Sequence, residues 1–219
     1  MTTEARIPLS RERVLRAAVA LADEHGLRAV TMRRLADELD AEAMSLYYHV
    51  AKKEDLLDGI VDVVAQEINE AVDRLEPGPD WRRTVRRRIL AAREVFLRHR
   101  WAPALFETRS STSLAVLKYY DALVGVMRDG GFSHDRIHHA LHALGSRALG
   151  FSHEVFDPNA GASAEIPGDL AAQLPNLAGM LSEIAHDDPD STLGWCDDQA
   201  EFEFGLDLIL DGLDLLRDR

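Results

Sequence analysis

The stretch that decides the fold is residues 31–53, TMRRLADELDAEAMSLYYHVAKK, which holds two helical patterns separated by a turn. In the first pattern, Thr31 has a hydroxyl that can cap a helix by accepting a hydrogen bond from a free amide of the first turn. The apolar residues that follow recur at helical spacing: Leu35, Ala36 and Leu39. The sequence therefore predicts a short amphipathic helix that ends where Asp40 and Ala41 interrupt the pattern.

A second short helix is expected at residues 42–49, with Leu46 as its inward anchor. Hydroxyls and an imidazole lie on its other face, and lysines follow directly: Ser45, Tyr47, Tyr48, His49, Lys52 and Lys53. Such groups suit hydrogen bonds to DNA phosphates and to base edges in a major groove. Two short helices with this arrangement are typical of a helix-turn-helix whose second helix contacts the bases.

Four stretches extend this pattern into a family resemblance. SLYYHVAKKEDLL (residues 45–57) and LRAAVALADEHGLRAVTMRRLADEL (15–39) resemble the DNA-binding helices of TetR-type transcriptional repressors. GGFSHDRIHHALHALGSRALGFSHE (130–154) and FEFGLDLILDGLD (202–214) are similar to the C-terminal domain of the tetracycline repressor branch. The resemblance implies an all-α fold, with an N-terminal three-helix head, a linker helix, and a C-terminal helical body that binds a ligand and dimerises.

The expected division of the chain follows its breaks in helical pattern. Residues 1–54 are predicted to form the DNA-binding domain, residues 55–80 a connecting helix and linker, and residues 81–219 the effector-binding and dimerisation domain. The connecting helix has a regular apolar face, and Glu76-Pro77-Gly78-Pro79-Asp80 stops it. By the same resemblance, the helices at 134–156 and 198–217 are expected to form a homodimer interface. In the last helix, apolar residues recur at steps of four and three: Phe202, Leu206, Ile209, Leu213 and Leu216.

The resemblance also assigns residues to a double-stranded DNA operator. Arg33 matches a base-contacting arginine, and five residues match phosphate-contacting or base-adjacent positions: Thr31, Ser45, Tyr47, His49 and Lys53. Ala43 and Met44 stand where the tetracycline repressor has Gln-Pro, so a different operator is expected, with apolar contact to a thymine methyl group. Tyr48 has two open interpretations, a DNA contact and a packing aromatic.

A small-molecule effector is the second expected partner, bound in the C-terminal body. Thr108 and Arg109 match a Thr-Arg pair of the tetracycline repressor, and Glu154 matches a carboxylate that helps to hold the metal-bound drug. Asn69 replaces a drug-contacting histidine, Leu123 replaces a polar contact, and Leu105 or Phe106 replaces the metal-coordinating histidine. Magnesium-tetracycline is therefore not the expected effector. The remaining candidates are polar groups and apolar lining of a pocket for a largely hydrophobic molecule with one polar group: Arg88, His142, Phe96 and Met127. Each of these could instead be ordinary core.

The composition of the chain limits the classes of protein to which it can belong. The net charge of −13 is concentrated in residues 154–219, which contain 16 acidic residues and two arginines. The other 153 residues therefore have a net charge of about +1. No run of 18 apolar residues and no signal-peptide pattern occur, which favours a cytoplasmic protein with no membrane partner. Cys196 is the only cysteine and excludes an intrachain disulfide.

Two alternatives stay open beside the ligand-responsive repressor. His134, His138 and His142 recur every four residues and could chelate a metal in a helical metal-dependent enzyme. However, no HExxH or GxSxG motif accompanies them, so we expect no enzyme activity, cofactor or metal. The other alternative is a DNA-binding protein that does not respond to a ligand.

Overall fold

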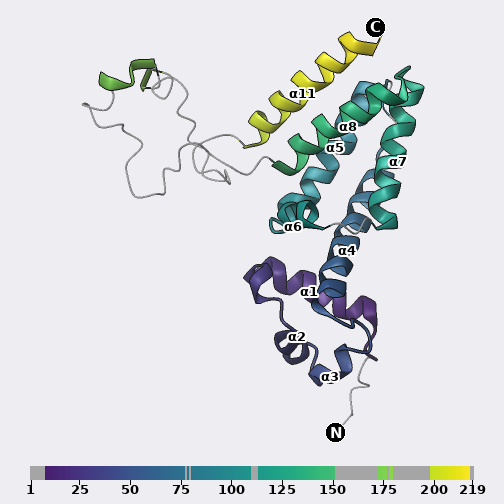
Figure 1. The fold of residues 1–219 in the computed structure, drawn as a ribbon, viewed down its shortest axis with the longest axis vertical. Helices are drawn as coiled ribbons and strands as arrows, with labels where there is room; N and C mark the ends of the chain where they lie inside the picture. The colour runs from purple at the N-terminus through teal and green to yellow at the C-terminus, as the bar shows by residue number, and fades with distance from the viewer. Residues whose placement is uncertain are drawn as a thin grey trace. The chain divides into compact units, whose positions relative to one another are not determined.

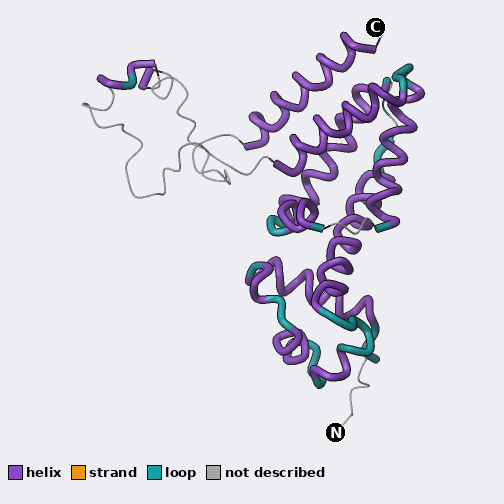
Figure 2. The backbone as a smooth tube through the Cα atoms, in the orientation of Figure 1, coloured by secondary structure: helices purple, strands orange, loops and turns teal. Residues whose placement is uncertain are grey.

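The computed structural model describes residues 8–76, 78, 80–109, 113–150, 172–176, 178–179 and 198–217. Within these residues all regular structure is helical (Figures 1 and 2), which confirms the predicted fold class. The chain divides into two compact units, Met1–Leu141 and His142–Arg219. The functional division at residues 54 and 80 stays a prediction. No helix in the described part of the chain is long and apolar enough to cross a membrane.

The helices begin and end close to the residues that their capping signals indicate. Ser10, Thr31 and Asp80 each accept a hydrogen bond from the backbone N–H three residues later, at 3.2, 3.3 and 2.8 Å. The elements are α1 (Arg11–His25), the 3-10 turn η1 (Leu27–Ala29), α2 (Met32–Glu38), α3 (Ala43–Leu46), α4 (Lys53–Asp73), α5 (Trp81–Arg98), α6 (Ala102–Thr108), α7 (Leu114–Asp129), α8 (His134–Gly150) and α11 (Asp198–Arg217). The predicted helix at 198–217 is confirmed, and the expected last turns at 151–156 lie outside the described residues.

Helix α4 belongs to two hydrophobic cores of the first unit. Its first half packs Leu56, Ile60 and Val61 into one core with α1, α2 and α3, the helices that we call the head. Its second half packs Val64, Ile68 and Val72 against α5 and the start of α6. Because one continuous helix contributes to both cores, the head is attached to the α5–α7 region through packed apolar surface, and no unpacked linker separates the two.

Helices α1 and α4 approach closely at Gly59. A Cβ atom placed at Gly59 would lie 2.9 Å from Cδ1 of Leu15, a distance that real Cβ atoms essentially never show. Leu15 is itself buried. The absence of a side chain at residue 59 therefore fixes how near the first helix of the head comes to α4.

In the second unit, Arg147 joins the C-terminal half of α8 to α11. Its guanidinium donates to the carbonyl oxygen of Glu201 and lies over the ring of Phe202, 5.0 Å from the ring centroid. A Cβ at Gly205 would meet this guanidinium at 2.8 Å, so the glycine makes room for it. Burial lowers the pKa of Arg147, and the charge of Glu201 partly opposes that shift.

The buried face of α11 differs from the predicted one. Phe202, Leu206 and Leu210 are fully buried, at steps of four, whereas the expected Leu216 is exposed. Ile209 and Leu213 are half-buried. An i, i+4 row is a ridge on the surface of one helix. These burials are those of a single chain, so the seam predicted for the dimer stays a prediction.

Candidate nucleic-acid interface and ligand cleft

The turn between α2 and α3 has the geometry of a tight helix-turn-helix corner. The N–H of Ala41 donates to the carbonyl oxygen of Ala36 at 2.9 Å, which closes the end of α2. Asp40 adopts a positive φ of 48°, a region that Asp and Asn enter more readily than most residues. Leu35, Leu39 and Leu46 are buried below this corner, so the turn is fixed by the core beneath it.

The second helix of the motif is shorter than predicted. The α-helix covers Ala43–Leu46, and residues 47–49 continue as turns. The backbone N–H of Ser45 donates to the carbonyl oxygen of Glu42, and that of His49 to the carbonyl oxygen of Leu46, both at 2.9 Å. The hydroxyl of Ser45 donates to the same Glu42 oxygen at 2.6 Å. Bonds over three residues tighten the backbone at both ends of α3, which shortens the regular α-helix.

The structure exposes most of the residues predicted to contact DNA. Tyr48 is 88% exposed and Met44 is 70% exposed, far more than large apolar side chains usually are. Four others are exposed, namely Thr31, Arg33, Tyr47 and Lys53, and the remaining three are half-buried, namely Ala43, Ser45 and His49. The exposure of Tyr48 excludes the packing interpretation within this chain. Lys53 is the first residue of α4, where a helix has free backbone N–H groups and a positive dipole end.

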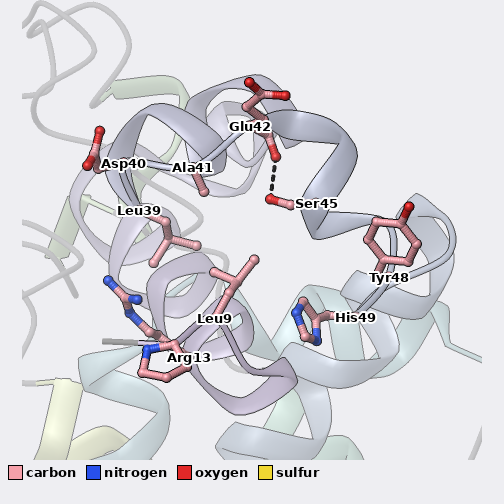
Figure 3. A pocket seen from close by; sticks show the side chains of 10 residues that line it. Leu9, Arg13, Leu39, Asp40, Ala41, Glu42, Ser45, Tyr48 and His49 are labelled. Carbon is pink, nitrogen blue, oxygen red and sulfur yellow. Dashed lines mark hydrogen bonds between the residues drawn. The ribbon is translucent and has the colours of Figure 1, made fainter. Parts of the chain in front are cut away.

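A hollow of about 460 Å³ lies beside α3 (Figure 3). Its lining comes from the residues before α1 and its first turn, from the helix-turn-helix corner, and from α3 and the turn after it: Pro8, Leu9, Arg13, Leu39, Asp40, Ala41, Glu42, Ser45, Tyr48 and His49. The figure shows Ser45 and Leu9 turned toward the hollow, with Tyr48 at its margin. Sequence reasoning did not indicate that residues 8–13 reach the corner, because the contact joins segments about 30 residues apart.

A cleft of about 500 Å³ between α4, α5 and α7 brings together two of the predicted effector residues, Asn69 and Arg88. The side-chain amide of Asn69 donates to the carbonyl oxygen of Ala115 at 2.9 Å, which ties α4 to α7. The guanidinium of Arg88 lies 5.8 Å from the ring centroid of Tyr119, and its buried Nε has no hydrogen-bond partner among the described residues. Burial raises the pKa of the Tyr119 phenol, and the charge of Arg88 lowers it in part.

The other predicted effector residues lie away from this cleft. Phe96 and Phe106 pack edge to face, with ring centroids 5.3 Å apart, and Leu105 is buried in the core of the head. Leu123 and Met127 are buried as well. His142 is exposed and lies in the second unit, while Glu154 lies outside the described residues.

Arg109 and Thr108 make contacts of their own at the end of α6. Arg109 Nε donates to Asp58 Oδ1 at 2.6 Å and its terminal nitrogen lies 3.5 Å from the carbonyl oxygen of Glu54, so it binds the start of α4. The hydroxyl of Thr108 donates to the carbonyl oxygen of Leu105 at 3.0 Å. In this conformation Arg109 ties the end of α6 to α4, whereas Thr108 bonds within α6.

Sequence reasoning missed most of the cleft. Its lining is completed by polar residues of α4 and by residues of α7: Asp62, Gln66, Glu70, Asp73, Leu114, Ala115, Lys118 and Ala122. The α4 residues recur at helical spacing opposite the apolar face, which was the signal available in the sequence. The cleft is more polar than the apolar pocket that we expected.

The histidine row of α8 does not form a metal cluster in this structure. His134, His138 and His142 are exposed along α8. In the part of the chain that the structure describes, no three His, Cys, Asp or Glu side chains are placed to hold one metal ion. Among the described residues, no further side chain is placed to complete a site with these histidine pairs.

Comparison with known proteins covers both regions. Residues 14–60 match the family model for bacterial regulatory proteins of the tetR family, and residues 75–216 match the tetracyclin repressor-like C-terminal domain. A curated HTH-type transcriptional regulator of Saccharopolyspora erythraea is 31% identical over 212 residues, which is 94% of this chain and 84% of the relative.

Two solved structures from Streptomyces coelicolor are also similar. A possible TetR family transcriptional regulator from strain A3(2) has a TM-score of 0.75 and 31% identity, covering 94% of this chain and all of that one. The TetR family protein ActR in complex with actinorhodin has a TM-score of 0.73 and 28% identity, covering 97% and 100% of the two chains. Since the family models together span the helix-turn-helix and most of the remaining chain, this protein belongs to the TetR family of transcriptional regulators.

Proposed function

We propose that the chain is a homodimeric repressor that binds a palindromic operator and releases it when a small molecule binds. The observation that carries the proposal is the surface of α3 and the turns after it. Tyr47, Tyr48 and Met44 are exposed there on a backbone that Leu46 anchors in the core. A monomer gains nothing from holding large apolar side chains in water, whereas a major groove offers them base edges and thymine methyl groups. Two such helices about 34 Å apart would contact successive major grooves.

The C-terminal helices support dimerisation. Phe204, Leu208 and Leu215 lie on the face of α11 opposite its buried stripe, and Phe204 and Leu215 are 66% and 76% exposed. Removing these apolar side chains from water on association would stabilise a dimer. We place the interface on α8 and α11, in a body that starts near residue 81 and follows a head and connecting helix with boundaries near residues 54 and 80.

The cleft between α4, α5 and α7 is our candidate for the effector site. Asn69 and Arg88 offer a ligand polar groups, and Leu114 and Ala115 offer it apolar contact. We propose an effector that combines an apolar part with several polar groups, because charged and amide side chains line this cleft beside Leu114 and Ala115. The ActR complex shows that a related protein binds actinorhodin, and it supports ligand binding by this fold. Release of DNA requires that the effector binds one conformation more tightly than the other, and a difference of about 1–3 kcal/mol gives a useful switch. The cytoplasm is the expected compartment, because the operator lies there.

The test begins with a gel shift on DNA flanking the protein's own gene, with excess competitor DNA and a series of salt concentrations. The double variant Tyr47→Ala with Lys53→Ala is expected to bind at least about tenfold more weakly, a loss of ~1.4 kcal/mol. Because a dimer loses two such lysines, Lys53→Ala alone should lower the salt slope by about two. The control is Tyr120→Ala on α7, which removes a tyrosine outside the head and outside the lining of the cleft. Undiminished affinity of the first variant would refute the proposed interface.

A further inference from the structure

A buried histidine joins three helices of the first unit. His99 is the C-cap residue of α5 and is 6% exposed. Its Nδ1 lies 2.8 and 3.0 Å from the two carboxylate oxygens of Asp23 on α1, and its Nε2 lies 3.1 Å from Glu67 Oε2 on α4. Trp101, the N-cap residue of α6, donates its indole N–H to Asp23 Oδ1 at 2.7 Å. We call Asp23, Glu67, His99 and Trp101 the junction.

The chemistry of the junction makes it sensitive to the loss of any partner. A neutral imidazole has one N–H and can donate to one carboxylate, whereas the imidazolium donates to both. If both carboxylates are ionised, His99 can therefore donate a hydrogen bond to Asp23 and to Glu67 at the same time only when both ring nitrogens carry a proton. Arg98 lies 3.6 Å from Glu67 and places a guanidinium beside that carboxylate. Replacing either carboxylate removes an ionised acceptor from one ring nitrogen of the buried imidazole.

The junction also has a mechanical consequence for α1. Gly59 and Leu15 mark the point where α4 and α1 approach closely, and Asp23 and Glu67 each lie eight residues farther along their helices. Eight residues correspond to about 12 Å of helix. The imidazole therefore binds both helices about 12 Å from their close approach. The core of the head already packs α1 on α4, and the contacts of the imidazole add a polar link about 12 Å from the close approach, which opposes a change in the orientation of α1 on α4.

We propose that the junction fixes the orientation of the head on α4–α6, and so sets the operator half-site spacing that a dimer accepts. His99 is in this sense a positioning residue, which acts on DNA only through α1 and the helices packed against it. The inference rests on the proposed DNA-binding function. It assigns spacing selectivity to residues that lie outside the helix-turn-helix and contact no DNA.

The probe is a palindromic duplex that the purified full-length protein selects from a randomised DNA pool, compared with the same duplex carrying one extra base pair at its centre. The measured quantity is the spacing ratio, which is the dissociation constant for the lengthened duplex divided by that for the selected duplex. Asp23→Asn and Glu67→Gln remove a charge with little change in shape, and both sites are partly exposed, so the variants are expected to fold. The matched control is Glu24→Gln, the exposed acid next to Asp23 on α1.

We expect the spacing ratio to fall about fivefold or more in both junction variants, which corresponds to a small allosteric coupling, and to stay unchanged in Glu24→Gln. A merely structural role would lower thermal stability and weaken binding to both duplexes by the same factor, so the spacing ratio would not change. An unchanged ratio in Asp23→Asn and Glu67→Gln would overturn the inference at any stability. If the unaltered protein selected no duplex at all, the proposed function would fail first, and the inference with it.

Discussion

Gly59→Ala is a direct test of the close packing between the head and α4. The new Cβ would lie within 3 Å of the methyl groups of Leu15, which is buried and has little room to move. Overpacking of this kind costs about 1–3 kcal/mol. Alanine at an interior helix position is favoured over glycine by about 1 kcal/mol. The steric cost is the larger of the two, so the variant is expected to be less stable by roughly 0–2 kcal/mol.

The chain offers a matched control at Gly125, an exposed glycine inside α7 whose added Cβ would meet no atom within 4 Å. Gly125→Ala is expected to gain the helix-propensity contribution of about 1 kcal/mol with no steric cost. Subtracting the two variants cancels that contribution and leaves the overpacking energy, about 1–3 kcal/mol. Urea unfolding followed by far-UV circular dichroism, at one protomer concentration, measures the difference. Equal stability of the two variants would refute the close approach of α1 and α4.

Three further changes test separate parts of the structure. Thr31→Ala removes the cap of α2 and is expected to cost about 1 kcal/mol of unfolding free energy, measured by urea denaturation; an unchanged value would mean that the hydroxyl does not cap the helix. Leu46→Ala empties a fully buried position and is expected to cost about 2–5 kcal/mol, with faster amide hydrogen exchange throughout α1–α3; protection equal to that of the parent protein would contradict the packing described for α3. Leu208→Glu places a charge on the exposed stripe of α11 and should shift the protein to monomer in sedimentation experiments; a dimer of unchanged affinity would exclude this face from the interface.

Features with a local cause could be predicted from the sequence. Ser10 and Thr31 cap their helices because a side-chain oxygen reaches an amide only three residues away. The burial of Leu46 follows from its place in an apolar pattern within one motif. The end of α3 was predicted less well, because the backbone tightens through Ser45 and His49 and this does not appear in the apolar spacing.

Contacts between distant segments could not be predicted in the same way. Arg109 meets Asp58 across 51 residues, and His99 meets Asp23 across 76, and no local pattern records either pairing. Some effector residues were assigned by resemblance and others as the lining of a pocket, and among those that the structure describes Asn69 and Arg88 line the cleft of the first unit. Which side chains line a cavity depends on how the helices pack, so the polar face of α4 was not predicted to line the cleft.

The shared core of the head limits how this protein can be recombined with its relatives. The core that holds α1–α3 in place is completed by Leu56, Ile60 and Val61 of α4 and by Leu105 of α6. A chimeric regulator that takes residues 1–54 from this protein and the rest from a relative would contain the helix-turn-helix without these four side chains. The relative's own residues would then have to fill the core of the head. To exchange operator specificity, it should therefore be better to replace α3 and the neighbouring surface residues only, and to keep the core residues of α1, α2, α4 and α6 from one protein.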